Sequence, residues 1–405
     1  MSIAALRSSP ECFQPSIAQA VPRGRDLRLD FFRGLALLMI FVDHVSGNRF
    51  AAITLQSLGF ADAAEMFVFI AGISGVYAYR KTILNTGFYA GSKAVFQRIR
   101  LLYLTHMAMV AGVVLLAAAA QLYGTGFDIL NKLGLEPLLA DPVQALLLLP
   151  VLAYMPNYLD ILPLYVILLA TLPLIVIGQR IHVLLPVAVA TAVYIYALVN
   201  GHTLPNLNDS EGWFLNPFSW LLLFTLGATV THLTITGFWS RLPRPLIAAI
   251  TTFAAGYVAF AFVFAAPWRV FPALESYSAL SLTIETNKAF LSWHRLLDIL
   301  AKVWLVAVLM PRDAVFLSHG IASAISRAGR HSLPVFVAGT FLALIGSVVL
   351  FETEGHALSH IGITFGGVFG LLVLAWKCEG GSVYAAFARS LSGIRGKPYG
   401  AVLTK

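Results

Sequence analysis

The residue types best suited to chemistry lie in the stretch RLDFFRGLALLMIFVDHVSGN, which begins at Arg28. Arg33 and His44 are eleven residues apart in this stretch. At about 100° per residue they share one helix face and lie about 16 Å apart along its axis. Histidine can take up and release a proton near neutral pH. His44 is therefore a candidate catalytic base, with Arg33 as a fixed cation at the other end of the same face.

Two aspartates accompany this pair. Asp30 lies on the same face, three residues before Arg33, and can pair with it. Asp43 points about 100° away from His44, so it reaches a partner on another helix, or the imidazole only if the helix end is distorted. The alternative is an interfacial arginine and a buried histidine that is bonded to a neighbour. Ionisable residues inside a membrane segment favour a functional site.

A second candidate pair is Asp62 and Glu65 in FADAAEMFVFIAGISG. These carboxylates are three residues apart and share a helix face, where one can raise the pKa of the other or both can bind sugar hydroxyls. The alternative is a helix N-terminus, where acidic residues offset the helix dipole. Gly72 and Gly75 in the same stretch favour close helix packing.

The segment WHRLLDILAKVW carries His294, Arg295, Asp298 and Lys302, which form a charged stripe on one predicted helix. The stripe is either an internal ladder of ion pairs or a cationic lining that draws an anionic donor or acceptor toward His44. Lys302 lies about two turns inside the predicted span, too deep for its ammonium to be explained by snorkelling to the interface.

Further candidates lie at predicted helix ends. Asp160, Asn216 and Trp220 are at external ends and are candidates for acceptor binding, although the membrane interface itself favours aromatic residues. Basic residues on the opposite side could grip a phosphorylated cytoplasmic ligand, with positive-inside topology as the alternative. They are Arg28, Arg98, Arg100, Arg327 and Arg330. No metal site is predicted.

A bundle of membrane helices must position these residues. Of the 405 residues, 59% are hydrophobic and 11% are charged, and the mean hydropathy is +0.81; soluble domains carry about 25% charged residues. The sequence predicts a single all-α membrane unit in which the run 143–153 is a re-entrant or interfacial helix. Each span needs roughly 20 residues, and the ten predicted spans are 29–47, 62–80, 98–122, 158–178, 182–199, 217–236, 246–266, 293–310, 332–351 and 360–378.

The distribution of Lys and Arg places both termini in the cytoplasm. Residues 1–28 and 381–405 are then cytoplasmic tails, and 29–380 form the membrane domain. The formal charge of +8 reflects this topology, and no nucleic-acid partner is expected. Cys12 and Cys378 are expected to form neither a disulfide nor a metal site. The external loops hold few cations, namely Arg49, Lys132, Arg269 and Lys288.

Several blocks of the sequence resemble one known family. Arg33, ten intervening residues and His44 resemble the Arg-x10-His motif of membrane-bound acyltransferases of the acyltransferase-3 type. More specifically, the chain resembles the OpgC family from residue 25 to about residue 380. The blocks that carry this resemblance are RDLRLDFFRGLALLMIFVDH, LGFADAAEMFVFIAG, LDILPLY, NPFSWLLLF and KAFLSWHRLLDILA. Ala71-Gly72 stands where Ser-Gly is more usual, with little expected consequence.

The resemblance implies a ten-helix transmembrane acyltransferase in the inner membrane of a bacterium. It implies transfer of an acyl group, with succinyl as the family's associated case, from cytoplasmic acyl-CoA to a periplasmic glucan or related glycan. His44 would be the base, Asp43 a second catalytic candidate that holds the imidazole, and Arg33 an aid to donor binding or helix placement. We also expect Arg295 and Lys302 to receive the carboxylate of a dicarboxylic acyl group.

Two questions stay open from the sequence. The acceptor hydroxyl either attacks the thioester directly, or an acyl-histidine forms first. The alternative function is a carrier or flippase for a small anion or lipid, in which the same charges line a pathway. The chain shows no convincing internal repeat, which disfavours a secondary transporter. A scaffold without activity leaves His44 and Lys302 unexplained. The oligomeric state is not predicted.

Overall fold

The computed structural model describes residues 26–265 and 287–380. Regular structure in these ranges is helical, and the only extended pairing there is an isolated bridge between Asn206 and Asp209. The long helices are α1 (Leu27–His44), α2 (Ala63–Thr86), α3 (Phe88–Leu122), α7 (Ile161–Ile181), α8 (Leu185–Asn200), α9 (Pro217–Ile235), α10 (Arg244–Ala265), α12 (Trp293–Leu309), α14 (Ser332–Glu352) and α15 (Ala357–Glu379). The short ones are α4 (Ile129–Leu133), α5 (Glu136–Ala140), α6 (Pro142–Leu148) and α13 (Gly320–Arg330).

Seven of the described helices are long and apolar enough to cross a membrane: α2, α3, α7, α9, α10, α14 and α15. The chain is therefore an all-α membrane protein. The other predicted spans also fall on helices, but α8 and α12 are shorter, with 16 and 17 residues. Helix α1 carries four charged residues within 18. The number of ten spans and the cytoplasmic placement of the termini stay predictions.

Three elements differ from those expected. Helix α3 begins at Phe88 rather than at 98, because its first ten residues are too polar to register as a span although they are helical. In the run 143–153, only residues 143–148 are helical and belong to α6, which ends there because Pro150 has no amide hydrogen to donate to the next helical hydrogen bond. Helix α13 was not expected at all, because it is short and has a polar face.

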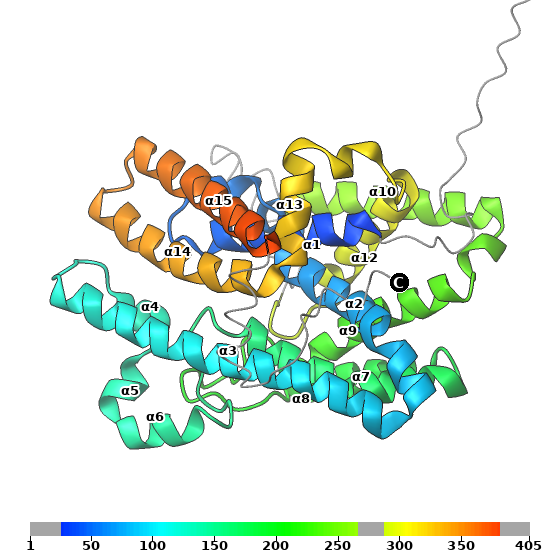
Figure 1. Ribbon diagram of the computed structural model, residues 1–405, viewed down its shortest axis with the longest axis horizontal. Coiled ribbons are helices and arrows are strands. Elements are labelled where there is room, and N and C mark those ends of the chain that lie inside the picture. The colour runs from blue at the N-terminus through cyan, green and yellow to red at the C-terminus, as the bar shows by residue number, and fades with distance from the viewer. Residues whose placement is uncertain (1–25, 266–286, 381–405) are drawn as a thin grey trace, which may run out of the picture.

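Helix α1 lies in the middle of the bundle, against α2, α13 and α14 (Figure 1). It crosses α13 with backbone against backbone: a Cβ atom on Gly34 would collide with the Ile325 carbonyl, and one on Gly329 with the Asp30 carbonyl. Glycine is the residue that allows such an approach. This crossing fixes the half of α1 that is remote from His44.

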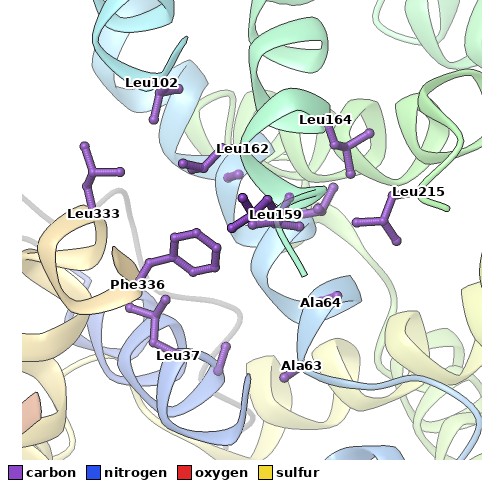
Figure 2. Close-up of a cluster of buried hydrophobic side chains, with 14 of the residues drawn as sticks. Leu37, Ala63, Ala64, Leu102, Leu159, Leu162, Leu164, Leu215, Leu333 and Phe336 are labelled. Carbon is purple, nitrogen blue, oxygen red and sulfur yellow. The ribbon is translucent and has the colours of Figure 1, made fainter. Parts of the chain in front are cut away.

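Helices α2 and α9 approach equally closely, and Gly72 lies at their contact, facing the carbonyl of Phe224. Gly75 packs against Leu172 of α7. The predicted packing role of both glycines is confirmed. Apolar side chains from α1, α2, α3, α7 and α14 then fill the core, where Figure 2 shows Leu37 and Phe336 side by side.

Candidate functional site

His44 is the last residue of α1, and its imidazole is half-buried. Its Nδ1 atom lies 2.6 Å from the carbonyl oxygen of Ile40, one turn earlier. A carbonyl oxygen can only accept a hydrogen bond, so Nδ1 carries the proton. The second ring nitrogen, Nε2, then has a free lone pair. This is the tautomer that a general base needs.

Tyr158 packs against this histidine, and Lys132 lies over the ring of Tyr158. The ring of Tyr158 meets the His44 ring edge to face, with centroids 5.0 Å apart. The ammonium of Lys132 lies 5.5 Å from the centroid of the Tyr158 ring, and its charge acts on His44. Tyr158 has a φ of 71°, a left-handed conformation that is costly for a bulky side chain. Neither residue was among the predicted site residues.

Asp43 does not orient His44. Its Oδ1 atom accepts a hydrogen bond of 2.5 Å from the hydroxyl of Thr54, which lies in the loop between α1 and α2. The hydrogen bond that orients the imidazole comes instead from Ile40. The expected arrangement, in which Asp43 holds the ring, is therefore corrected: successive residues of the intact helix point in different directions.

Asp62 and Glu65 form a capping box at the start of α2. Asp62 accepts from the amide of Ala64, and the Glu65 carboxylate accepts from the amide of Asp62. Both also bind Arg295 of α12, at 3.0 Å and 2.6 Å. Burial acts to raise the pKa of Asp62, but Lys288 and Arg295 hold it well below its usual range. Asp62 is thus a fixed anion and not a proton donor.

Asp298 and Lys302 tie α12 to the loop that leads into α2. The completely buried carboxylate of Asp298 accepts hydrogen bonds of 2.8 Å from the amides of Phe60 and Ala61. The ammonium of Lys302 lies 2.7 Å from the same carboxylate. Of the internal ladder that was one of the two interpretations, only the pair of Asp298 and Lys302 lies within α12. Arg295 pairs instead with Asp62 and Glu65 at the start of α2.

His294 faces away from this ladder. Its Nδ1 atom lies 3.2 Å from the hydroxyl of Tyr257 on α10, and its ring contacts Phe60. The four residues of the expected stripe therefore do not share one environment, because His294 and Arg295 are adjacent and diverge around the helix.

Asn216 and Trp220 are both completely buried. Asn216 donates its backbone amide to the carbonyl of Ala289, and the indole of Trp220 donates to the carbonyls of Lys288 and Ala289 at 3.2 Å. Trp220 thus offers no ring face to a sugar, which corrects the expected role in acceptor binding. Both residues instead hold the segment that carries Lys288.

Lys288 is the cation that interacts with several of these residues. Its ammonium lies 2.6 Å from the Asp62 carboxylate and 5.7 Å from the centroid of the Phe214 ring. Its charge also acts on His44 and Asp43. Lys288 and Lys132 were not predicted as site residues. The signal that could have found them was their place among the few cations of the external loops.

Asp160 precedes α7 and lies near the same lysine. Burial raises its pKa to about 6, and the charge of Lys288 opposes that shift. The N-terminal ends of α2, α7 and α9 thus meet around Lys288, next to the C-terminal end of α1. This cluster, made of His44, Tyr158, Lys132, Lys288, Asp62 and Asp160, is called the His44 site below.

The predicted donor-side cations lie elsewhere. Arg33 is bonded to the hydroxyl of Ser74 on α2 and lies 3.9 Å from the Asp30 carboxylate. Arg28 pairs with Asp26 and donates to the carbonyl of Met310 at 2.7 Å, which joins α1 to the end of α12. Both arginines therefore position α1, and their role in donor binding stays a prediction.

The remaining four arginines lie on two helices, α3 and α13. Arg327 and Arg330 of α13 both bind the Glu379 carboxylate at the end of α15, at 2.8 Å and 2.5 Å. Arg98 and Arg100 lie on α3, where Arg98 is half-buried and Arg100 is exposed. Whether any of them contacts a phosphorylated donor stays a prediction.

Comparison with known protein families gives one match: the family of the OpgC protein matches residues 25–380. No curated protein and no solved structure matches the chain significantly. The matched range covers α1 to α15 and every residue of the His44 site. The chain therefore belongs to the OpgC family, which indicates an acyltransferase-type role in the modification of glucans.

Proposed function

We propose that the protein transfers a succinyl group from succinyl-CoA in the cytoplasm to a hydroxyl of a periplasmic glucan, in the inner membrane of a bacterium. Family membership supports the class of reaction. The observation that carries the assignment of the base is the hydrogen bond of His44 Nδ1 to the Ile40 carbonyl. It leaves Nε2 able to accept a proton.

In this proposal, Nε2 of His44 takes the proton of the acceptor hydroxyl. The hydroxyl oxygen attacks the thioester carbonyl carbon, and a tetrahedral oxyanion forms. Collapse of the oxyanion breaks the carbon–sulfur bond and completes the ester. The departing thiolate takes the proton back from the imidazolium, so the enzyme is regenerated and coenzyme A leaves as a thiol. Direct attack needs no acyl-histidine.

Lys132 is the cation that fits the distal carboxylate of the succinyl group. Arg295 and Lys302, which were expected to receive it, are each engaged by buried carboxylates. Lys288 is engaged by Asp62. Lys132 forms no ion pair with a carboxylate among residues 26–265 and 287–380, and its charge acts on His44. A carboxylate there gains a partner without displacing one.

Arg33 would lie along the path of the donor from the cytoplasm. It is on the same α1 face as His44 and is held by Ser74. With the cytoplasmic orientation of the termini, the nucleotide stays on the inner side while the thioester reaches His44.

The test uses the full chain reconstituted in liposomes with succinyl-CoA and a neutral glucan. The wild type should release free thiol and form succinyl-glucan, and His44→Ala should lose both. His202→Ala is the control, because His202 is an exposed histidine next to α8, outside the His44 site. If folded His44→Ala releases thiol at the wild-type rate, His44 is not the catalytic base. Anion flux without thiol release would favour the carrier instead.

A further inference from the structure

A second polar site lies at the other end of the bundle. It is a cavity of about 260 Å³ between α2, α7 and α9, and it is lined by Arg80, Leu84, Val176, Arg180 and His232. These residues lie toward the C-terminal ends of the three helices, whereas the N-terminal ends of the same helices meet at the His44 site. We call this cavity the Arg80 pocket. It belongs neither to the His44 site nor to the ion-pair ladder.

The Arg80 pocket holds cations without anions. Arg80 and Arg180 form no ion pair with any carboxylate in the described part of the chain. The charge of Arg80 acts on His232, whose Nδ1 atom is buried and meets no hydrogen-bonding group among those residues. The two guanidinium groups, next to this imidazole and the apolar walls, repel each other unless an anion lies between them.

The ordinary explanation for cations at a helix end covers only part of this arrangement. Arg180 and His232 lie in the last turns of α7 and α9, where a positive charge offsets the helix dipole. Arg80 lies six residues before the end of α2 and has no such role. The cavity is also larger than the roughly 30 Å³ that one water occupies in the liquid. It is large enough for a tetrahedral anion with its hydration.

We propose that the Arg80 pocket binds the phosphate group of an anionic ligand. Two arginines can hold phosphate oxygens through paired N–H donors, and His232 Nδ1 can supply a further hydrogen bond when it is protonated. Two ligands carry this chemistry to this end of the bundle: an anionic phospholipid headgroup and the nucleotide of an acyl thioester. The proposal does not depend on the acyl transfer proposed above.

The experiment measures the thermal unfolding of the purified full chain in a neutral detergent, with inorganic phosphate titrated against sodium chloride at equal ionic strength. Phosphate should raise the unfolding temperature of the wild type. Arg80→Gln and Arg180→Gln should each weaken phosphate binding at least tenfold. Lys81→Gln is the matched control, because Lys81 is an exposed cation next to Arg80 that does not line the pocket. It should bind phosphate as the wild type does.

Two further arms identify the source of the phosphate. If coenzyme A competes with inorganic phosphate in the wild type but not in Arg80→Gln, the ligand of the Arg80 pocket is a nucleotide. If phosphatidylglycerol competes with inorganic phosphate and phosphatidylcholine does not, the ligand is an anionic lipid headgroup. Equal phosphate binding by wild type, Arg80→Gln and Arg180→Gln would overturn the proposal, as would a wild type that responds no more to phosphate than to chloride.

Two variants keep the test decisive. If an arginine variant does not fold, His232→Gln takes its place and should also weaken phosphate binding. His44→Ala should bind phosphate normally even though it loses acyl transfer, so failure of the proposed function and failure of the Arg80 pocket give different results.

Discussion

The guanidinium of Arg295 lies 2.6 Å from the carboxylate of Glu65, which is completely buried and 230 residues away in the chain. This contact joins α12 to α2 beneath the His44 site. With Asp62, Asp298, Lys288 and Lys302 it makes a cluster of three carboxylates and three cations, so the buried charge is balanced.

Arg295→Met should destabilise the protein by about 3–5 kcal/mol, because it leaves the Glu65 carboxylate buried without its cation. The measurement is the free energy of unfolding in mild detergent. The double variant Arg295→Met/Glu65→Gln should recover part of the loss, since it removes the orphaned charge. A single variant as stable as the wild type would show that this ion pair does not hold the two helices together.

Lys132→Gln should change the choice of donor. A charged hydrogen bond to a carboxylate contributes about 1.5–3 kcal/mol, so the preference for succinyl-CoA over butyryl-CoA should fall roughly tenfold or more. Rates of thiol release with the two donors give this ratio. Arg49→Gln removes an exposed cation in the loop that follows α1 and should leave the ratio unchanged. An equal loss with both donors would assign Lys132 to the reaction centre rather than to the distal carboxylate.

Asp160→Asn should change stability in a pH-dependent way. Because burial raises the pKa of Asp160 to about 6, the folded state binds more protons than the unfolded state between pH 3.8 and about 6. The protonated carboxyl therefore favours the folded state near pH 4, and this contribution to the free energy of unfolding is lost as the pH rises to 6 and the carboxyl ionises. The gain in unfolding temperature of Asp160→Asn over the wild type should be small at pH 4 and largest above pH 7. Glu136→Gln, at an exposed position, should show no such trend.

Gly34→Ala should destabilise the crossing of α1 and α13, because the added methyl group collides with the Ile325 carbonyl. Overpacking typically costs about 1–3 kcal/mol, and here the obstacle is backbone that cannot rotate away. The unfolding temperature in detergent should fall. Gly362→Ala on α15 meets no atom within 4 Å and should leave it unchanged. Equal behaviour of the two variants would mean that the helices separate easily.

Much of the fold could be predicted from apolar runs, because membrane helices are long and must satisfy their own backbone. Each predicted span falls on a helix. Helix α13 was missed, since a short helix with a polar face has no such signal. The contacts of Arg295 and Lys302 could not be predicted from the sequence, because residue spacing shows which side chains share a helix face but not which distant segment packs against that face. Lys288 reaches its place because Trp220 holds its backbone, a relationship that no local pattern contains.

The charge-balanced contact between α2 and α12 also constrains how the protein is made. Glu65 is synthesised 230 residues before Arg295, so α2 enters the membrane long before its counter-ion exists. A nascent chain that stops short of residue 293 holds an acid in lipid with no basic partner from α12. Until α12 arrives, this carboxyl group must either be protonated or remain near water. Completion of the His44 site is therefore a late event in biogenesis.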